Sequence, residues 1–164
     1  MKSYKFIILA ICTFLLFRST TYSQTNQWGD PVFETRLSIS FTNQLVHPGS
    51  AIDLKCVTKN FSTNTVCFIR TDWRGMYEID LVSDSGKKIK LNDPLKAGDS
   101  MSTMGGVADG ESFELTISAS FDHTILPGHY NLMVKQKVYL IKNFDRKNMT
   151  SGELVSNTIK VDVQ

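Results

Sequence analysis

The sequence predicts an all-β protein, an antiparallel β-sandwich of seven to nine short strands. Apolar and polar residues alternate with a period of two through most of the chain after residue 32. Clusters of Gly, Pro, Asn and Asp interrupt these runs at intervals typical of short strands joined by turns. No long window after the N-terminal region shows the apolar stripe of a helix.

Residues 1–23 read as a signal peptide. Two lysines precede an apolar run, Phe6 to Phe17, that is too short to cross a bilayer as a helix. Small residues, Thr21 and Ser23, precede the expected cut before Gln24. An uncleaved anchor is the alternative, although Arg18 ends the apolar run early. We expect a secreted or periplasmic protein, with attachment to the cell surface as an alternative.

The remaining chain divides into a flexible N-terminal lead, residues 24–32, and one β-sandwich domain, residues 33–164. The full chain has 18 basic and 16 acidic residues, and removal of Lys2, Lys5 and Arg18 with the leader gives a net charge of −1. This balance argues against a nucleic-acid partner. No second long apolar segment follows the leader, so we expect no membrane span in the mature chain.

The first expected strand covers Phe33–Phe41, and His47-Pro48-Gly49-Ser50 turns the chain into the second, where Ile52, Leu54 and Cys56 alternate with polar residues. After a polar turn the alternation and β-branched content predict three more strands, at Val66–Arg70, Tyr77–Val82 and Lys87–Leu91.

Residues 92–110 are rich in glycine and predict a long connection with room for one short strand. Phe113, Leu115 and Ile117 mark the next strand. A long strand follows the Pro127-Gly128 turn, from Tyr130 to Leu140. A polar stretch leads to the last expected strand, Leu154 to Val163.

Two motifs resemble immunoglobulin-like β-sandwich domains of secreted bacterial proteins. The first is Pro48-Gly49-Ser50-Ala51-Ile52-Asp53-Leu54 followed by Lys59-Asn60-Phe61-Ser62, and the second is Leu126-Pro127-Gly128-His129-Tyr130-Asn131-Leu132-Met133-Val134. The resemblance implies an immunoglobulin-like sandwich with Tyr130 as a structural corner, its ring buried and its hydroxyl bonded to nearby backbone.

A second segment, Tyr77 to Lys87, resembles the central hairpin of the bacterial intracellular proteinase inhibitor family, which is also a sandwich. The resemblance implies that a surface loop could block a protease, but it assigns no inhibitory residue in this chain.

Two cysteines, Cys56 and Cys67, remain after the leader, and they lie symmetrically about Phe61-Ser62. A hairpin centred there would place them opposite each other, so we expect a structural disulfide. The spacing of a redox pair, C-x-x-C, is absent.

Catalytic and metal-binding patterns do not stand out. His123 and His129 flank the Pro127-Gly128 turn, but they lack the further ligands of a metal site and the serine elbow of a hydrolase. Glu78, Asp80 and Asp84 alternate along one strand and are expected on a solvated face. We therefore expect no enzyme activity, no metal and no cofactor.

The candidate binding residues are basic and aromatic: Lys142, Phe144, Arg146 and Lys147 near the last hairpin, and Trp73 in a turn. In an immunoglobulin-like topology the loops at 59–65 and 141–152 lie at the same pole. Asn60-Phe61-Ser62 and Asn148-Met149-Thr150 also match the glycosylation sequon.

The sequence therefore favours a secreted, non-catalytic binding module for an unknown protein or glycan. A proteinase inhibitor presenting a surface loop is one alternative. A small hydrolase using His123 or His129 is another.

Overall fold

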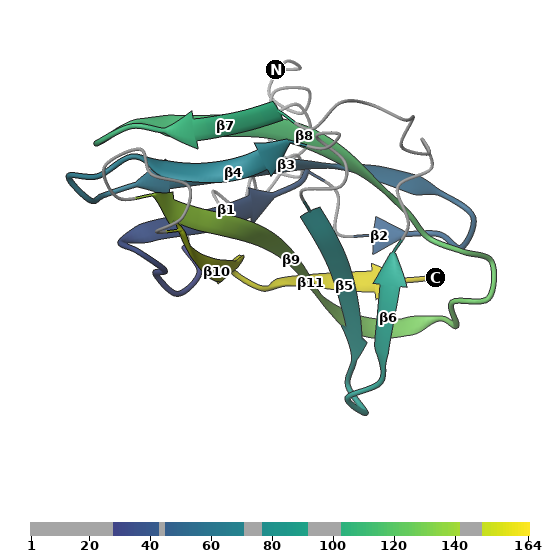
Figure 1. Ribbon diagram of the computed structural model, residues 1–164. Helices are drawn as coiled ribbons and strands as arrows, with labels where there is room; N and C mark the ends of the chain where they lie inside the picture. Colours follow the sequence, from purple (N-terminus) through teal and green to yellow (C-terminus); the bar gives the residue numbers. More distant parts are fainter. Residues whose placement is uncertain (1–27, 43–44, 71–76, 92–102, 142–148) are drawn as a thin grey trace, which may run out of the picture.

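The structure is a computed structural model, which describes residues 28–42, 45–70, 77–91, 103–141 and 149–164. These residues form two β-sheets and, within the described ranges, no helix (Figure 1). The strands are β1 (Thr35–Ser40), β2 (Leu45–Val46), β3 (Ala51–Asn60), β4 (Val66–Arg70), β5 (Tyr77–Ser83), β6 (Lys88–Leu91), β7 (Thr103–Val107), β8 (Ser112–Ser120), β9 (Gly128–Ile141), β10 (Met149–Val155) and β11 (Ile159–Val163).

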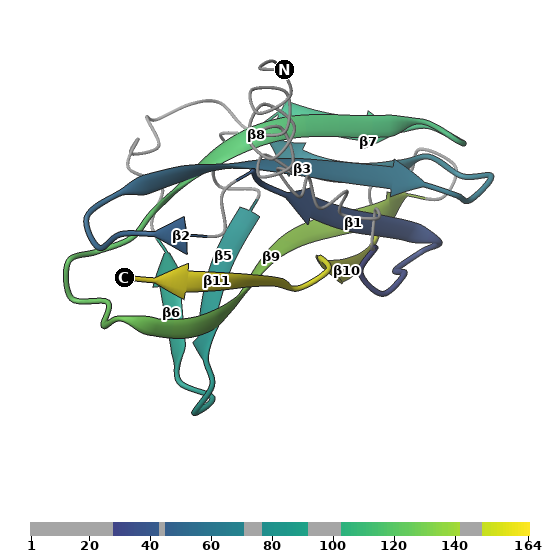
Figure 2. The same ribbon diagram turned by 180° about the vertical axis from the view of Figure 1, so that it is seen from behind.

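The smaller sheet has three antiparallel strands in the order β1-β3-β8, which run side by side when the molecule is seen from behind (Figure 2). The predicted alternation sets its inner face: Leu37, Ile39, Leu54 and Ile117 are at most 2% exposed. Polar and charged residues between them face outward, so the register follows from the apolar pattern.

The larger sheet has eight strands built around β9, which pairs with four others. Along one edge β9 pairs first with β11 and then with β10. Along the other, residues 130–136 of β9 pair with β5, and the end of β9 pairs with β4. The β5–β6 hairpin stands out from the rest of this sheet (Figure 1).

The order of the strands is that of an immunoglobulin-like sandwich. If β1, β3 and β8 are taken as strands A, B and E, then β4, β9 and β10–β11 are C, F and G of the opposite sheet. The prediction of an all-β, immunoglobulin-like sandwich is therefore confirmed. The pairing is antiparallel except where β2 lies parallel to β11.

There are eleven described strands rather than seven to nine. The single strand expected over Leu154 to Val163 is divided into β10 and β11 by residues 156–158. The division has a physical cause: the Asn157 amide accepts a hydrogen bond from Ile39 N (2.7 Å) and donates to Ile39 O (3.1 Å). Ser156 N still donates to Val134 O on β9, whereas the Asn157 side chain bonds the edge of β1 and so links the two sheets.

A second polar link crosses the core. Thr58 Oγ1 on β3 donates to Gln136 Oε1 on β9 over 2.6 Å, and neither residue is exposed. The bond satisfies the Thr58 hydroxyl and the Gln136 carbonyl oxygen, while Gln136 Nε2 is buried with no hydrogen-bond partner among the described residues. The apolar part of the core includes Phe121, Leu81, Leu132 and Leu154, all fully buried.

Candidate functional site

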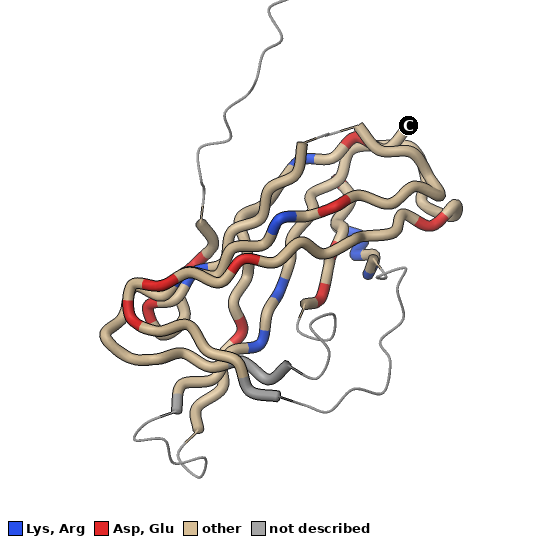
Figure 3. Tube along the Cα trace, turned by 90° about the horizontal axis from the view of Figure 1, so that it is seen from above, with Lys and Arg blue, Asp and Glu red and all other residues tan. Residues whose placement is uncertain are grey.

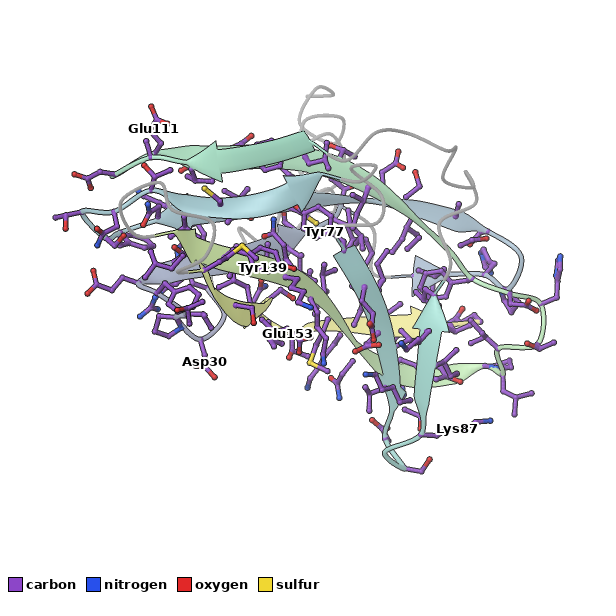
Figure 4. The ribbon with its side chains drawn as sticks, in the orientation of Figure 1. Asp30, Tyr77, Lys87, Glu111, Tyr139 and Glu153 are labelled. Atoms are coloured by element: carbon purple, nitrogen blue, oxygen red, sulfur yellow. The ribbon has the colours of Figure 1, made fainter. Side chains whose placement is uncertain are left out.

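The predicted binding residues Lys142, Phe144, Arg146, Lys147 and Trp73 lie outside the described residues. The chain beside the first four is described: Val66, at the start of β4, pairs with Leu140, near the end of β9. Loop 61–65, which leads into β4, therefore emerges at the same end of the sandwich as the end of β9. In Figure 4, Asp30 and Glu111 mark this end, and Lys87 marks the tip of the β5–β6 hairpin.

The predicted cross-strand disulfide is not formed, because Cys56 and Cys67 are free thiols in different sheets. The chain crosses from one sheet to the other between β3 and β4, so the expected hairpin does not exist. Cys56 faces the core and is 0% exposed, whereas Cys67 follows the buried Val66 and points to the opposite side of its sheet. Burial raises the pKa of the Cys56 thiol to about 12.

Tyr130 begins the described part of β9 that pairs with β5, and its ring is 6% exposed. Its hydroxyl donates to Leu126 O over 2.7 Å, which closes the bend before the strand. This is the geometry of the tyrosine corner of immunoglobulin-like folds.

The histidines serve local structure. The His129 ring is hydrogen-bonded to Asp162, its partner across β9 and β11, and this bond is the main reason why the pKa of His129 lies above its ordinary value. The His123 ring fills the space that a side chain at Gly49 would need. Among the described residues, no three His, Cys, Asp or Glu side chains gather as metal ligands would.

The carboxylates on β5 were expected on a solvated face, and for Asp80 this is wrong. Asp80 is 0% exposed, and Lys88 Nζ lies 2.7 Å from its Oδ2. Glu78 is half-buried, and its pKa is lowered chiefly by a hydrogen bond from Lys90, 2.9 Å away. The acidic residues lie on β5 and the lysines on β6, so they pair across the sheet. Figure 3 shows acidic and basic residues on neighbouring parts of the backbone trace.

The described residues hold one exposed aromatic surface at the end where loop 61–65 emerges. Phe61 is 49% exposed, and its ring meets Trp28 edge-on with centroids 5.8 Å apart and planes at 87°. The two rings line a depression of about 580 Å³ together with Pro31, Glu34 and Arg36. Lys59 Nζ lies 5.1 Å from the centre of the Phe61 ring. We call these six residues the Trp28 patch.

Residues 28–34 are held against the sandwich, which fixes Trp28 in place. Gly29 N donates to Leu37 O over 2.9 Å, and an added Cβ at Gly29 would lie 1.7 Å from Val155 O. A tight two-residue turn follows, with Phe33 and Glu34 at φ of 52° and 56° and mutual hydrogen bonds between Val32 and Thr35.

Phe61 is fixed from the other side by Asn60, which is completely buried. The Asn60 amide donates to Asn64 O (2.6 Å) and Val107 O (2.9 Å) and accepts bonds from the backbone and hydroxyl of Ser62. Phe61 N also donates to Glu34 O over 3.0 Å. With its nitrogen committed inside the fold, Asn60 is not a glycosylation acceptor in the folded protein.

Sequence reasoning did not assign Phe61, Arg36, Lys59 and Glu34 to a site. One signal was present: Phe61 is an aromatic residue in an otherwise polar turn. The other signal is the position of Arg36 opposite Lys59 in the β1–β3 register, which the sequence alone does not define.

No protein-family model matches the chain, and no curated protein matches its sequence. Among solved structures, it is similar to a family 123 glycoside hydrolase from Clostridium perfringens, with 12% identity, a TM-score of 0.44 and 80% of this chain covering 27% of the enzyme. It is similar to a β-glucosidase from Listeria innocua, with 15% identity, a TM-score of 0.45 and 79% of this chain covering 16% of that one.

It is also similar to the CARDB domain of the PF1109 protein from Pyrococcus furiosus, solved with two metal ions. The identity is 13%, the TM-score is 0.40, and 85% of this chain covers 92% of that domain. This chain thus spans about a quarter of the glycoside hydrolase and less of the β-glucosidase.

Within the described part of the chain, no helix is long and apolar enough to cross a membrane.

Proposed function

We propose that this chain is an exported, non-catalytic binding module that holds its partner at the Trp28 patch. The observation that carries the proposal is the Trp28–Phe61 pair, exposed above a depression of about 580 Å³. An aromatic side chain left half in water is a feature of binding surfaces, where rings contribute a large share of the contact energy.

The surroundings of the patch suit this role. Hydrogen bonds from Asn60 and to Glu34 O hold Phe61 in place, so little conformational entropy would be lost on binding. The patch offers aromatic faces, two cations and one carboxylate, which are means of holding a ligand rather than of breaking bonds. The predicted leader and the resemblance to secreted immunoglobulin-like domains support export.

The test compares three versions of residues 24–164 as baits against extracellular and envelope extracts and on a glycan array. The versions are the wild type, Phe61→Ala and, as a matched control, Leu126→Ala. Leu126 is also an exposed apolar residue (72%), but it lies before the Tyr130 corner rather than in the patch.

We expect a ligand that is lost with Phe61→Ala and kept with Leu126→Ala. A ligand that both variants retain would place the binding surface elsewhere and overturn the proposal. A captured protease would be assayed for inhibition, because inhibition at this patch would make the module a proteinase inhibitor.

A further inference from the structure

Two cations face each other beside the aromatic rings of the Trp28 patch. Arg36 on β1 and Lys59 on β3 are direct partners in the antiparallel register, and both are half-buried. Like charges placed directly opposite on neighbouring strands destabilise a sheet. Such a pair is favourable where an anion binds between or beside the two charges.

Several other cations on the described strands have acidic partners, whereas Lys137 and Lys160 make no ion pair with a described residue. Lys55 lies on β3, four residues before Lys59, and its Nζ is 2.8 Å from a Glu114 oxygen. Lys90 and Lys135 likewise pair with Glu78 and Glu153, each at 2.9 Å. In the described part of the chain, neither Arg36 nor Lys59 makes an ion pair. The patch has a single carboxylate, Glu34, so its formal charge is positive.

Trp28 adds apolar surface beside these charges. It lines the depression with Arg36 and Phe61 and also a second one, of about 490 Å³, formed with Gly29, Asp30 and residues 155–158. The indole therefore stands between two open depressions. A pyranose ring has a face of C–H bonds that packs on an aromatic ring, while its hydroxyl and carboxylate groups lie at the rim.

From this arrangement we infer that the ligand of the Trp28 patch is a glycan that carries carboxylate groups, such as a uronic-acid oligosaccharide. This inference rests on the proposed function. The sugar ring packs on Trp28, and its carboxylate lies between the Arg36 guanidinium and the Lys59 ammonium.

An acidic peptide would fit the charge but not the backbone around the patch. Extended peptides often bind by adding a strand to a free sheet edge. The edge of β1 beside the patch is already occupied, because Val32 pairs with Thr35, Gly29 N donates to Leu37 O, and the Asn157 amide bonds both backbone groups of Ile39. A glycan needs no such edge.

The test measures binding of residues 24–164 to tetragalacturonate and to its methyl ester, in which each charged carboxylate is replaced by a neutral ester. A poly-glutamate peptide serves as the acidic peptide. Calorimetric titrations would be made with the wild type and with Arg36→Gln, Lys59→Gln and Glu34→Gln. Lys55→Gln is the matched control, because Lys55 is a cation on the same strand that already has a partner.

We expect the acid to bind at least about tenfold more tightly than the ester, with an advantage that shrinks as salt is added. Arg36→Gln and Lys59→Gln should each weaken binding of the acid about tenfold, Glu34→Gln should strengthen it, and Lys55→Gln should change it little. Circular dichroism of each variant would check that the fold is retained.

Equal binding of acid and ester, no binding of the acid, or tighter binding of poly-glutamate would overturn the inference. The proposed function would survive any of these results if a different ligand were still lost with Phe61→Ala. If Phe61→Ala affected no ligand, the proposed function would fail as well.

Discussion

At Asn60 a single amide side chain makes hydrogen bonds to the loop that follows it and to the end of β7. Asparagine suits the position because its planar amide carries two donors next to an acceptor. The bonds hold loop 61–65 close to the start of β1 and present Phe61 to solvent. The geometry of the patch thus depends on a residue that does not itself line it.

Replacement of Asn60 by Ala should therefore destabilise the protein by about 2–3 kcal/mol, because buried backbone carbonyls would lose their partners. Urea unfolding would measure the change. Asn64→Ala is the control, since the Asn64 side chain is exposed and only its backbone N–H and carbonyl take part in the loop. Similar losses for both variants would contradict the assigned role.

The bond between His129 and Asp162 predicts a dependence on pH. Because the pKa of His129 is raised in the folded protein, the pair favours the fold below the ordinary histidine pKa of about 6.5. This contribution is lost as the pH rises through the folded-state pKa. In an NMR titration, Asp162→Asn should lower the pKa of His129 clearly, and Asp84→Asn should lower it less. An unchanged value in Asp162→Asn would refute the account.

Among the elements, the turn between Val32 and Thr35 has a backbone that its residues do not favour. Both central residues have positive φ, a conformation in which hairpin turns usually carry Asn-Gly. The Phe33 ring packs beside Gly152, and this contact offsets the unfavourable backbone conformation. A Cβ added at Gly152 would lie 3.0 Å from Phe33 Cε2. The strain falls on Phe33 and on Glu34, which is itself a member of the Trp28 patch.

Glu34→Gly should raise the free energy of unfolding by about 0.5–1 kcal/mol, because glycine adopts this conformation without a steric penalty. Thermal or urea unfolding would show the gain. Glu111→Gly is the control: Glu111 is also exposed in a turn but has no positive φ, so glycine there should be neutral or destabilising. A loss in Glu34→Gly would show that the Glu34 side chain stabilises the turn.

The strands themselves were largely predictable from the sequence. Val66–Arg70 is found with the expected bounds, and Tyr77 and Leu81 lie in a strand as expected, because alternation is a local property. Partners are not local. The same period-two pattern fits a hairpin between β3 and β4 and also a crossover from one sheet to the other. The disulfide prediction assumed the hairpin and was wrong, because the chain makes the crossover. The opposition of Arg36 and Lys59 depends on that same choice of partners.

On the scale of the whole molecule, the two sheets are joined by packing and hydrogen bonds rather than by the two cysteines. Thr58–Gln136 and the Asn157 amide provide polar links. Cys56 instead occupies the core as a small apolar side chain, in keeping with its raised pKa.

A reducing agent should therefore leave the urea midpoint unchanged. In a thiol assay on the native protein, Cys67 should react first, because it is only partly buried, and Cys56 should react only on unfolding. Cys67→Ser should remove the early phase. Absence of any free thiol, together with a midpoint that falls on reduction, would restore the disulfide.

The position of β9 in the chain bears on when the protein can fold. β9 joins β11, β10, β5 and β4 into one sheet, yet it begins only at Gly128. We expect residues 24–127 to be digested by a protease at concentrations that leave residues 24–164 intact. Resistance of the shorter chain would show that the first sheet is stable without the second.

During synthesis, β4 and β5 leave the ribosome well before the strand that joins them, so the nascent chain has no complete core to close over. The order of strands along the chain thus delays completion of the core until β9 has been synthesised. If the protein is exported as we propose, a translocation channel that accepts only unfolded chains could engage it throughout that interval.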